Sequence, residues 1–257
     1  MGGALLEGWL AAGVVSADAV RVADKLTGPE VAARLGVHAC ASVDAIAGAE
    51  VVVVAVKPQT IESALGDLPF VASQLVISVA AGVPAARLRA LVAPARVIRT
   101  MPNLACGVRQ GVTAVLAGPN EVAEDVERTL ALFRAVGHAE PLADEGLFHA
   151  ATALVGSGPA YLFVAMQAMA DGAVAAGLPR DTARRLAAAT VRGAGAVAVE
   201  SDAHPEALKD AVASPGGTTI AALGILERCG YRGALFDAVH AAAERSKALA
   251  AATGGER

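Results

Sequence analysis

The residues with the clearest chemical potential form a glycine- and hydroxyl-rich segment before an expected helix. Residues 214–219 read Ser-Pro-Gly-Gly-Thr-Thr, and a helical pattern begins at Thr218. The first N–H groups of a helix lack acceptors within the helix, and this end favours negative charge. Together with the hydroxyl groups of Ser214, Thr218 and Thr219, these amides can bind a carboxylate or a phosphate. The same pattern is also typical of an ordinary capped helix start.

A second group of candidates follows two expected strands. Residues 55–58 read Ala-Val-Lys-Pro at the end of an apolar run, and residues 80–82 read Ala-Ala-Gly after the next run. Ligands of open α/β sheets bind at the carboxyl ends of strands. Small side chains at 80–82 would let a flat ring approach the backbone. The alternatives are a surface lysine at Lys57 and an ordinary turn glycine at Gly82.

Two more polar segments have an open role. Arg99 and Asn103 close a further expected strand, where Arg99 can form an ion pair and Asn103 can cap a helix or line a cleft. Residues 156–158 read Gly-Ser-Gly before a long helical pattern, which indicates either a helix cap or the wall of a cleft.

Metal and triad chemistry find no support in the sequence. The five histidines have no partner at i, i+4 and no acidic neighbours at ligand spacing. No G-x-S-x-G elbow supports a Ser/His/Asp triad. The three cysteines are far apart and form no CxxC pair, which favours a reducing cytoplasm. We therefore expect no metal site.

Composition favours a folded protein with a small substrate. Hydrophobic residues make up 55% of the 257 residues, charged residues 18% and aromatic residues 3%. A net charge of −4 gives no positive field for nucleic acid or anionic lipid. Unbroken apolar runs such as residues 51–56 are far below the roughly 20 residues of a membrane span. We expect a cytoplasmic protein that binds neither membrane nor nucleic acid.

The first half of the chain alternates strand and helix patterns. Expected strands cover residues 19–23, 49–56, 75–79, 96–100, 111–116 and 139–142, and expected helices cover residues 4–12, 29–35, 84–92 and 120–136. A further short helix is expected after a cap by Ser42 and Asp44, and another begins near Pro58. Such alternation predicts right-handed crossovers and a doubly wound α/β sheet.

The second half contains no convincing strand. Long alanine-rich helices are expected at residues 159–176, 180–200 and 231–251, and shorter ones at 205–213 and 218–229. The change predicts two domains, residues 1–143 for an α/β nucleotide-binding domain and residues 144–257 for an all-α domain.

The beginning of the chain lacks an expected element. A dinucleotide-binding domain starts with a buried strand that leads into G-x-G-x-x-G, whose last glycine opens the first helix. Here Gly2 occupies that last position, and the first strand and the first two glycines are absent. One interpretation is an ordinary N-terminal helix. The other, which we favour, is a start codon assigned too far downstream or a truncated chain, in which activity depends on the lost strand.

Taken together, six segments resemble one family in order along essentially the whole chain. They are residues 53–59 (VVAVKPQ), 78–83 (SVAAGV), 99–103 (RTMPN), 156–161 (GSGPAY), 204–210 (HPEALKD) and 214–220 (SPGGTTI). This combination is similar to the pyrroline-5-carboxylate reductases, and the last segment is their most specific signature. The resemblance implies reduction of the cyclic imine of 1-pyrroline-5-carboxylate to L-proline by NADPH or NADH, the last step of proline biosynthesis.

The resemblance also implies an architecture and site residues. It implies an N-terminal Rossmann-type domain, followed by a helical domain that intertwines with a second subunit in a homodimer or a larger homo-oligomer. The implied cofactor-binding residues are Gly2, Ser42, Ala55, Val56, Lys57, Pro58, Ala80, Ala81 and Gly82. The implied substrate-binding residues are Ser214, Gly216, Gly217, Thr218 and Thr219, with the Thr219 hydroxyl as the catalytic group near the imine nitrogen.

Cofactor preference and two other functions stay open. Asp24 follows the second expected strand, where an acidic residue favours the free ribose 2′-hydroxyl of NADH, while Lys25 can instead meet a 2′-phosphate. A related two-domain enzyme such as a β-hydroxyacid dehydrogenase is an alternative, although the chain lacks a catalytic lysine motif in the first long helix of its second half. A dimeric scaffold that no longer binds a dinucleotide is the non-enzyme alternative.

Overall fold

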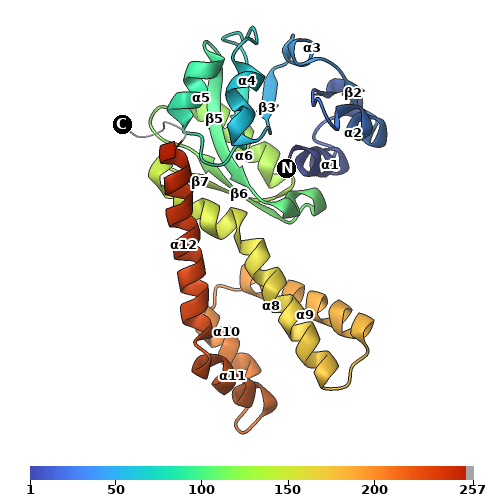
Figure 1. Cartoon of the computed structure of the whole chain (residues 1–257), viewed down its shortest axis with the longest axis vertical. Helices are drawn as coiled ribbons and strands as arrows, with labels where there is room; N and C mark the ends of the chain where they lie inside the picture. Colours follow the sequence, from blue (N-terminus) through green and yellow to red (C-terminus); the bar gives the residue numbers. More distant parts are fainter. Residues whose placement is uncertain (253–257) are drawn as a thin grey trace. The chain divides into compact units, whose positions relative to one another are not determined.

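The computed structural model describes residues 1–252 of the chain. Its contacts define two compact units. Unit 1 combines Met1–Ser157 with the helix segment that begins at His240, and unit 2 is Gly158–Val239. The confirmed fold class is α/β with a C-terminal helical region (Figure 1). The predicted division into domains between residues 143 and 144 stays a prediction.

A five-stranded sheet with the order β3-β4-β5-β6-β7 forms the centre of unit 1. Runs of valine, isoleucine and leucine favour strands that are covered on both faces, and β4 is buried along its whole length. Val54 pairs with Ser78, and Ser78 pairs with Arg99, so three parallel strands end at one edge of the sheet. The strands are β3 (Val51–Val54), β4 (Leu75–Ser78), β5 (Arg96–Pro102), β6 (Gly111–Leu116) and β7 (Gly137–Leu142).

The step from β5 to β6 departs from the predicted winding. These two strands are antiparallel, with Thr100 opposite Val115. Only residues 103–110 connect them, including the short helix η3 (Leu104–Val108). A crossover to a parallel strand needs about a dozen residues or more. The expectation of a crossover at this step was therefore wrong, because the connection is too short for one.

A second, smaller sheet holds the first two strands. The strands β1 (Arg21–Val22) and β2 (His38–Ala39) are parallel, and in the part of the chain that the structure describes no ladder joins them to the larger sheet. The sequence predicted a longer strand at residues 19–23 and none at 38–39. Short helices surround this sheet: η1 (Ala17–Ala19), α2 (Gly28–Leu35) and α3 (Ser42–Ile46).

Helices cover both faces of the large sheet, because successive strand residues point to opposite faces. On one face, Leu75 and Ile77 pack with α1 (Gly2–Ala12) and α6 (Ala123–Arg134), where Trp9 and Phe133 meet edge to face. On the other face, Val76 packs with α4 and α5. The helix α1 also packs on the small sheet through Leu6. The bounds of the remaining elements here are η2 (Pro58–Thr60), α4 (Ile61–Leu65) and α5 (Ala85–Val92).

Connecting helices follow β7. They are η4 (Glu145–Leu147), α7 (Phe148–Ala151) and the π-helical turn η5 (Thr152–Gly156). The predictions did not include these three elements, since each is no longer than five residues.

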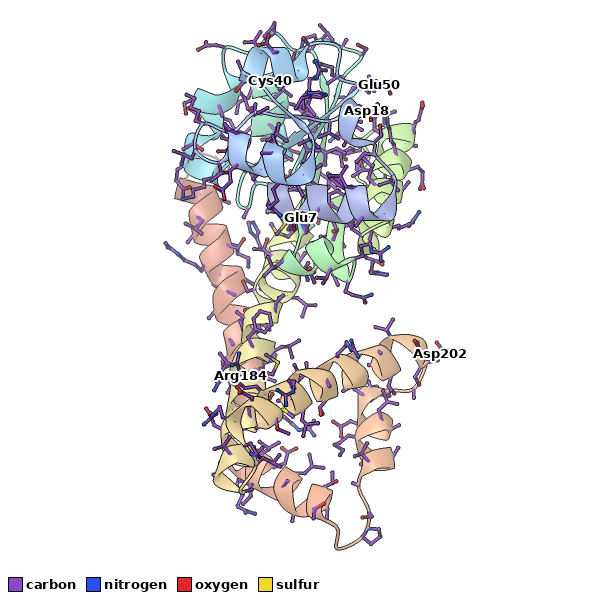
Figure 2. All side chains as sticks on the ribbon, turned by 90° about the vertical axis from the view of Figure 1, so that its right-hand side faces the viewer. Glu7, Asp18, Cys40, Glu50, Arg184 and Asp202 are labelled. Carbon is purple, nitrogen blue, oxygen red and sulfur yellow. The ribbon has the colours of Figure 1, made fainter. Side chains whose placement is uncertain are left out.

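Unit 2 is built from helices, as the sequence predicted. Small side chains let α8 and α9 pack closely through Ala170, Ala183 and Ala187. Figure 2 shows Arg184 on α9 and Asp202 just after this helix. The helices are α8 (Gly158–Ala175), α9 (Arg180–Glu200), α10 (Pro205–Val212), α11 (Thr218–Arg228) and α12 (Tyr231–Ala252), and the last one continues into unit 1.

One helical stretch has the length and composition of a membrane span. It covers Glu145–Ala175, 31 residues with a mean hydropathy of 1.3, and only 11% of its apolar window is buried inside this chain. The expectation that no segment is long enough for a membrane span rested on unbroken apolar runs, and polar residues interrupt this stretch. Its exposed apolar side chains need a partner of some kind.

Candidate functional site

The turn after β3 contains the first predicted cofactor residues. Ala55, Val56 and Pro58 are half-buried, while Lys57 is exposed and forms no ion pair with another described residue. The start of α1 lies against this turn, because a Cβ added to Gly2 would come within 3.0 Å of the Ala55 Cβ. The structure therefore brings Gly2 and Ala55 together, and a larger residue at position 2 would push them apart.

The turn after β4 lies at the same edge of the sheet. Ala80 and Gly82 are buried and Ala81 is exposed. Gly82 has φ +73°, the left-handed region that glycine adopts without strain. At the base of the turn, the Ala80 N–H donates to the Ser78 hydroxyl at 3.3 Å. The two turns that were predicted as cofactor sites thus follow the carboxyl ends of neighbouring parallel strands, which is where ligands of open α/β sheets bind.

A pocket of about 190 Å³ opens beside Ala81 and Gly82. It lies entirely within unit 1. Its polar groups are the hydroxyls of Thr152, Ser157 and Ser246 and the Arg245 guanidinium; the full lining is Ala81, Gly82, Thr152, Ser157, Ala242, Arg245, Ser246 and Leu249. This lining combines apolar side chains with a few polar groups that can bind a carboxamide, as small-molecule sites do, and Ala81 and Gly82 leave room for a ring. The residues present therefore fit a nicotinamide ring.

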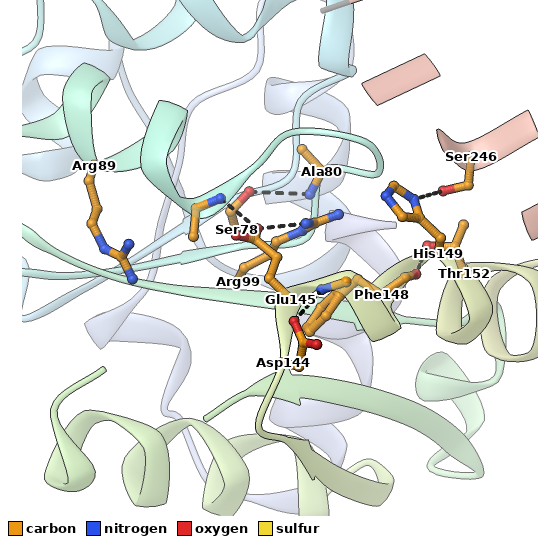
Figure 3. Close-up of polar contacts among 12 residues, drawn as sticks. Ser78, Ala80, Arg89, Arg99, Asp144, Glu145, Phe148, His149, Thr152 and Ser246 are labelled. Atoms are coloured by element: carbon orange, nitrogen blue, oxygen red, sulfur yellow. Dashed lines mark hydrogen bonds and ion pairs between the residues drawn. The ribbon is translucent and has the colours of Figure 1, made fainter. Parts of the chain in front are cut away.

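The C-terminal part of α12 closes one side of this pocket. His149 on α7 and Ser246 on α12 are both buried, and their Nδ1 and Oγ atoms are 3.0 Å apart (Figure 3). The backbone N of Ala250 and the Leu249 Cβ would each lie 3.9 Å from a Cβ added to Gly82. The sequence analysis assigned this helix to the helical domain and missed its contacts with unit 1.

Asp24 is a charged turn residue after β1. Its Oδ1 accepts the N–H groups of Thr27 and Leu26 at 2.7 and 2.8 Å. These bonds, that of Thr27 first, lower the pKa of the Asp24 carboxyl below its ordinary value. Ser42 begins α3 after β2. The expected cap of this helix by Ser42 and Asp44 was wrong, because Ala41 is the N-cap residue and no side chain bonds to the helix start. Within residues 1–252, Ser42 forms no side-chain hydrogen bond with the other predicted cofactor residues.

The signature segment lies in unit 2 and leads into α11. Gly216 has φ +68°, and a Cβ added to Gly217 would lie 2.2 Å from the Ser214 Oγ, so both positions favour glycine. Gly217 is the N-cap of α11, and no side chain caps the helix. Thr218 is exposed and Thr219 half-buried. The first N–H groups of α11 therefore have no acceptor within the helix or from a capping side chain. The hydroxyls of Thr218 and Thr219 lie in the same turn, and this turn contains no acidic residue.

Ion pairs connect the three helices around this segment. Arg232 on α12 pairs with Glu206 on α10 at 2.6 Å and with Glu227 on α11 at 2.7 Å. Lys209 adds a second cation to Glu206 at 2.9 Å. The Arg232 guanidinium, and next Lys209, lower the pKa of Glu206 to about 2. Because these groups are exposed or, for Lys209, only half-buried, their ion pairs contribute little stability, but they link both helices that flank residues 214–217 to α12.

Two family models match the chain in succession. The model described as NADP oxidoreductase, coenzyme F420-dependent, matches residues 1–82, and the model described as pyrroline-5-carboxylate reductase dimerisation matches residues 145–249. Among curated proteins, the pyrroline-5-carboxylate reductase of Methanosarcina acetivorans is 42% identical over 255 residues, which cover 97% of this chain and 94% of the relative. The chain belongs to the pyrroline-5-carboxylate reductase family. The Escherichia coli pyrroline-5-carboxylate reductase is 38% identical over 257 residues, with the same coverage of both chains.

Solved pyrroline-5-carboxylate reductases have the same fold. The Plasmodium falciparum enzyme, solved with NADP bound, has a TM-score of 0.87 at 27% identity and covers 97% of this chain and 94% of its own. The Coxiella burnetii enzyme has a TM-score of 0.85 at 31% identity and covers 96% and 93%. The resemblance found in the sequence is therefore confirmed, and so is the prediction of an enzyme that uses NADPH or NADH.

Several features of this pyrroline-5-carboxylate reductase fold escaped the sequence analysis. Thr152 and Arg245 line the pocket at Gly82 although 93 residues separate them in sequence, and only the fold reveals this. Asn103 caps η3 through its Oδ1, which settles one open alternative. A larger hollow of about 420 Å³ between α8 and α9 contains none of the predicted site residues. Among residues 1–252, no cluster of three or more potential metal ligands exists.

Proposed function

We propose that this chain reduces 1-pyrroline-5-carboxylate to L-proline with NADPH or NADH. The observation that carries the proposal is the uncapped, glycine-led start of α11, which can grip a carboxylate, in a chain whose other unit has the cofactor-binding turns. The two relatives that the chain matches over 94% of their length carry the name of this activity. Residues 1–143 would bind the dinucleotide, and residues 144–257 would form the dimerisation and substrate domain.

The cofactor-binding residues we propose are Gly2, Ser42, Ala55, Val56, Lys57, Pro58, Ala80, Ala81 and Gly82. Their support is the position of two turns at one sheet edge and the pocket beside Gly82. When bound, the reduced nicotinamide supplies a hydride for the imine carbon. The protein's own residues orient the ring, and orientation alone is worth about 7–11 kcal/mol in favourable systems. The small side chains at positions 80–82 allow the close approach that this requires.

The substrate-binding residues we propose are Ser214, Gly216, Gly217, Thr218 and Thr219. The amides of the first turn of α11 would bind the substrate carboxylate, because the helix end carries partial positive charge. The Thr219 hydroxyl would donate a hydrogen bond to the ring nitrogen. A proton from solvent, relayed through the Thr219 hydroxyl, would go to the ring nitrogen and the hydride to the adjacent carbon, so the C=N bond becomes a C–N bond with one new N–H and one new C–H bond. No strong general base is needed, in keeping with the lack of His or Glu in this segment.

Replacement of Thr219 tests the mechanism. Thr219→Ala should lower kcat/KM for pyrroline-5-carboxylate by about 10- to 100-fold, since a hydrogen bond to a charged group is worth about 1.5–3 kcal/mol. Thr219→Ser keeps the hydroxyl and should retain most of the rate, while Thr218→Ala shows how much the neighbouring hydroxyl of the same proposed site contributes. Dissociation constants for NADPH and NADH should stay within error in all three variants. An unchanged rate in Thr219→Ala would remove this hydroxyl from the reaction.

We also propose that the chain forms a homodimer or a larger homo-oligomer in the cytoplasm. The support is the match to a dimerisation family and the exposure of large apolar side chains in unit 2. Phe163 is 54% exposed, Val164 72% and Val199 87%. A second copy that covers them would also account for the apolar helix Glu145–Ala175 without a membrane. Binding of nucleic acid or membrane stays an expected absence.

A further inference from the structure

A buried arginine lies beneath the turn that follows β4. Arg99 is 3% exposed, and its Nη1 donates to the Glu145 Oε1 at 2.7 Å (Figure 3). Its guanidinium carbon lies 4.7 Å from the centre of the Phe148 ring. The Nε and Nη2 atoms have no hydrogen-bond partner among the described residues. Because a guanidinium stays charged, this arginine depends on Glu145 for its neutralisation.

The same carboxylate oxygen also binds the backbone of the turn. Glu145 Oε1 accepts the Ala85 N–H at 2.7 Å. Ala85 is the first residue of α5, directly after residues 80–84. Glu145 therefore links the buried Arg99 guanidinium to the backbone N–H of Ala85 at the end of the turn, although Glu145 and Ala85 are 60 residues apart in sequence.

The other end of the turn is fixed as well. The Ala80 N–H donates to the Ser78 hydroxyl at 3.3 Å, and the Ser78 carbonyl accepts the Thr100 hydroxyl at 3.0 Å. Thr100 and Arg99 are neighbours on β5, so both ends of residues 80–84 are bonded to the interior next to one strand. Ser78, Arg99 and Thr100 are buried and Glu145 is half-buried, and hydrogen bonds to charged groups in such surroundings are among the stronger ones.

We propose that Glu145 and Arg99 are positioning residues for the reduction, which hold residues 80–84 in the shape that binds the nicotinamide end of the cofactor. Arg99 orients the Glu145 carboxylate, and the carboxylate fixes the Ala85 amide. The proposal rests on the proposed function of residues 80–82. Neither side chain needs to touch the cofactor, so loss of the pair should weaken cofactor binding and leave the carboxylate-binding segment of unit 2 unaffected.

The test compares Glu145→Ala with Glu145→Gln and with a control substitution in a second arginine–glutamate ion pair. Gln keeps an oxygen that can accept the Ala85 N–H but lacks the charge that neutralises Arg99. The control is Glu121→Gln, since Glu121 pairs with Arg89 on the same helix α5, its side chain is 3% exposed, and it lies away from residues 80–84 in sequence. Each of the three variants removes an arginine–glutamate ion pair whose glutamate contacts α5. Glu145 contacts this helix through the Ala85 N–H, and Glu121 contacts it through Arg89.

We expect Glu145→Ala to raise the Kd and KM for the dinucleotide on the order of tenfold or more, while the KM for pyrroline-5-carboxylate stays close to the unmodified value. Glu145→Gln should recover much of the loss. Hydrogen exchange should accelerate at residues 80–85 in Glu145→Ala and not in Glu121→Gln, whereas thermal unfolding should fall to a similar degree in both.

Two outcomes would overturn the proposal. One is a Glu145→Ala protein that binds the dinucleotide like Glu121→Gln. The other is equal exchange at residues 80–85 in these two variants. If the unmodified chain binds a dinucleotide but fails to reduce pyrroline-5-carboxylate, the proposed substrate is wrong, and dinucleotide affinity and hydrogen exchange still decide the role of Glu145.

Discussion

The contact between α1 and η3 predicts the effect of a single methyl group at Gly8. A Cβ at this position would lie 2.4 Å from the Cys106 carbonyl oxygen and 2.8 Å from a Val136 methyl carbon. Alanine in a helix is favoured over glycine by about 1 kcal/mol. Overpacking in a dense interior costs about 1–3 kcal/mol, and the upper part of this range applies because the closest atom is backbone and cannot rotate away. Gly8→Ala should therefore destabilise the protein by about 1–2 kcal/mol.

The assay is thermal and urea unfolding at fixed protein concentration, because an oligomer's midpoint depends on it. The expected loss corresponds to a midpoint lower by about 2–8 °C, at about 2–4 °C per kcal/mol for a protein of this size class. Gly3→Ala in the same helix is the matched control, since no atom lies within 4 Å of its added Cβ. It should be neutral or stabilising by up to about 1 kcal/mol.

The two substitutions must therefore differ in sign. A Gly8→Ala protein as stable as the unmodified one, or a Gly3→Ala protein that loses more stability than Gly8→Ala, would refute the reasoning. Since α1 begins at Gly2 beside Ala55, displacement of this helix should also raise the KM for the dinucleotide in Gly8→Ala but not in Gly3→Ala.

Three further predictions concern cofactor choice, pH and assembly. Asp24→Ser should raise the ratio of kcat/KM for NADPH to that for NADH by about tenfold, because a carboxylate repels a 2′-phosphate; an unchanged ratio in steady-state assays would exclude Asp24 as the selector. The lowered pKa of Glu206 should give a stability contribution that is present above pH 4.5 and is lost as the pH falls toward about 2. The difference in unfolding midpoint between the unmodified chain and Glu206→Gln should therefore vanish over this pH range, and it should shrink in high salt. Val164→Glu should give a smaller species in light scattering, because a charge in an apolar interface is costly; an unaltered mass would place the interface elsewhere.

Long, strongly patterned segments were predictable from the sequence. The bounds of β6 and α9 agree with the expected ones, because a short segment rich in β-branched residues and a 21-residue helical pattern each leave few alternatives. The two-residue strand β2 was missed, since His38 and Ala39 form no apolar run. The antiparallel arrangement at Thr100 could have been inferred from the short connection to β6, which was a signal the pattern analysis did not use.

The site was predictable only in part. The turns at Ala55 and Gly82 follow neighbouring parallel strands. Ligands of open α/β sheets bind at the carboxyl ends of strands, so the order of strands along the sequence was enough to predict both turns as site candidates. The partner of Arg99 was not predictable, because Glu145 lies 46 residues away and either of two nearby carboxylates in sequence, Asp144 or Glu145, could have paired with it. The contact between His149 and Ser246 spans 97 residues and depends on the return of α12 to unit 1.

That return of α12 has a consequence for biosynthesis. In sequence, unit 2 is inserted between the two parts of unit 1. The ribosome therefore makes every residue of unit 2 before it makes Ser246 and Ala250, which are buried in unit 1. Until then the nascent cofactor-binding half lacks one wall of its pocket and exposes the surface that α12 later covers. The last folding step of this half therefore has to wait for the synthesis of α12, and contacts between residues distant in sequence slow this step.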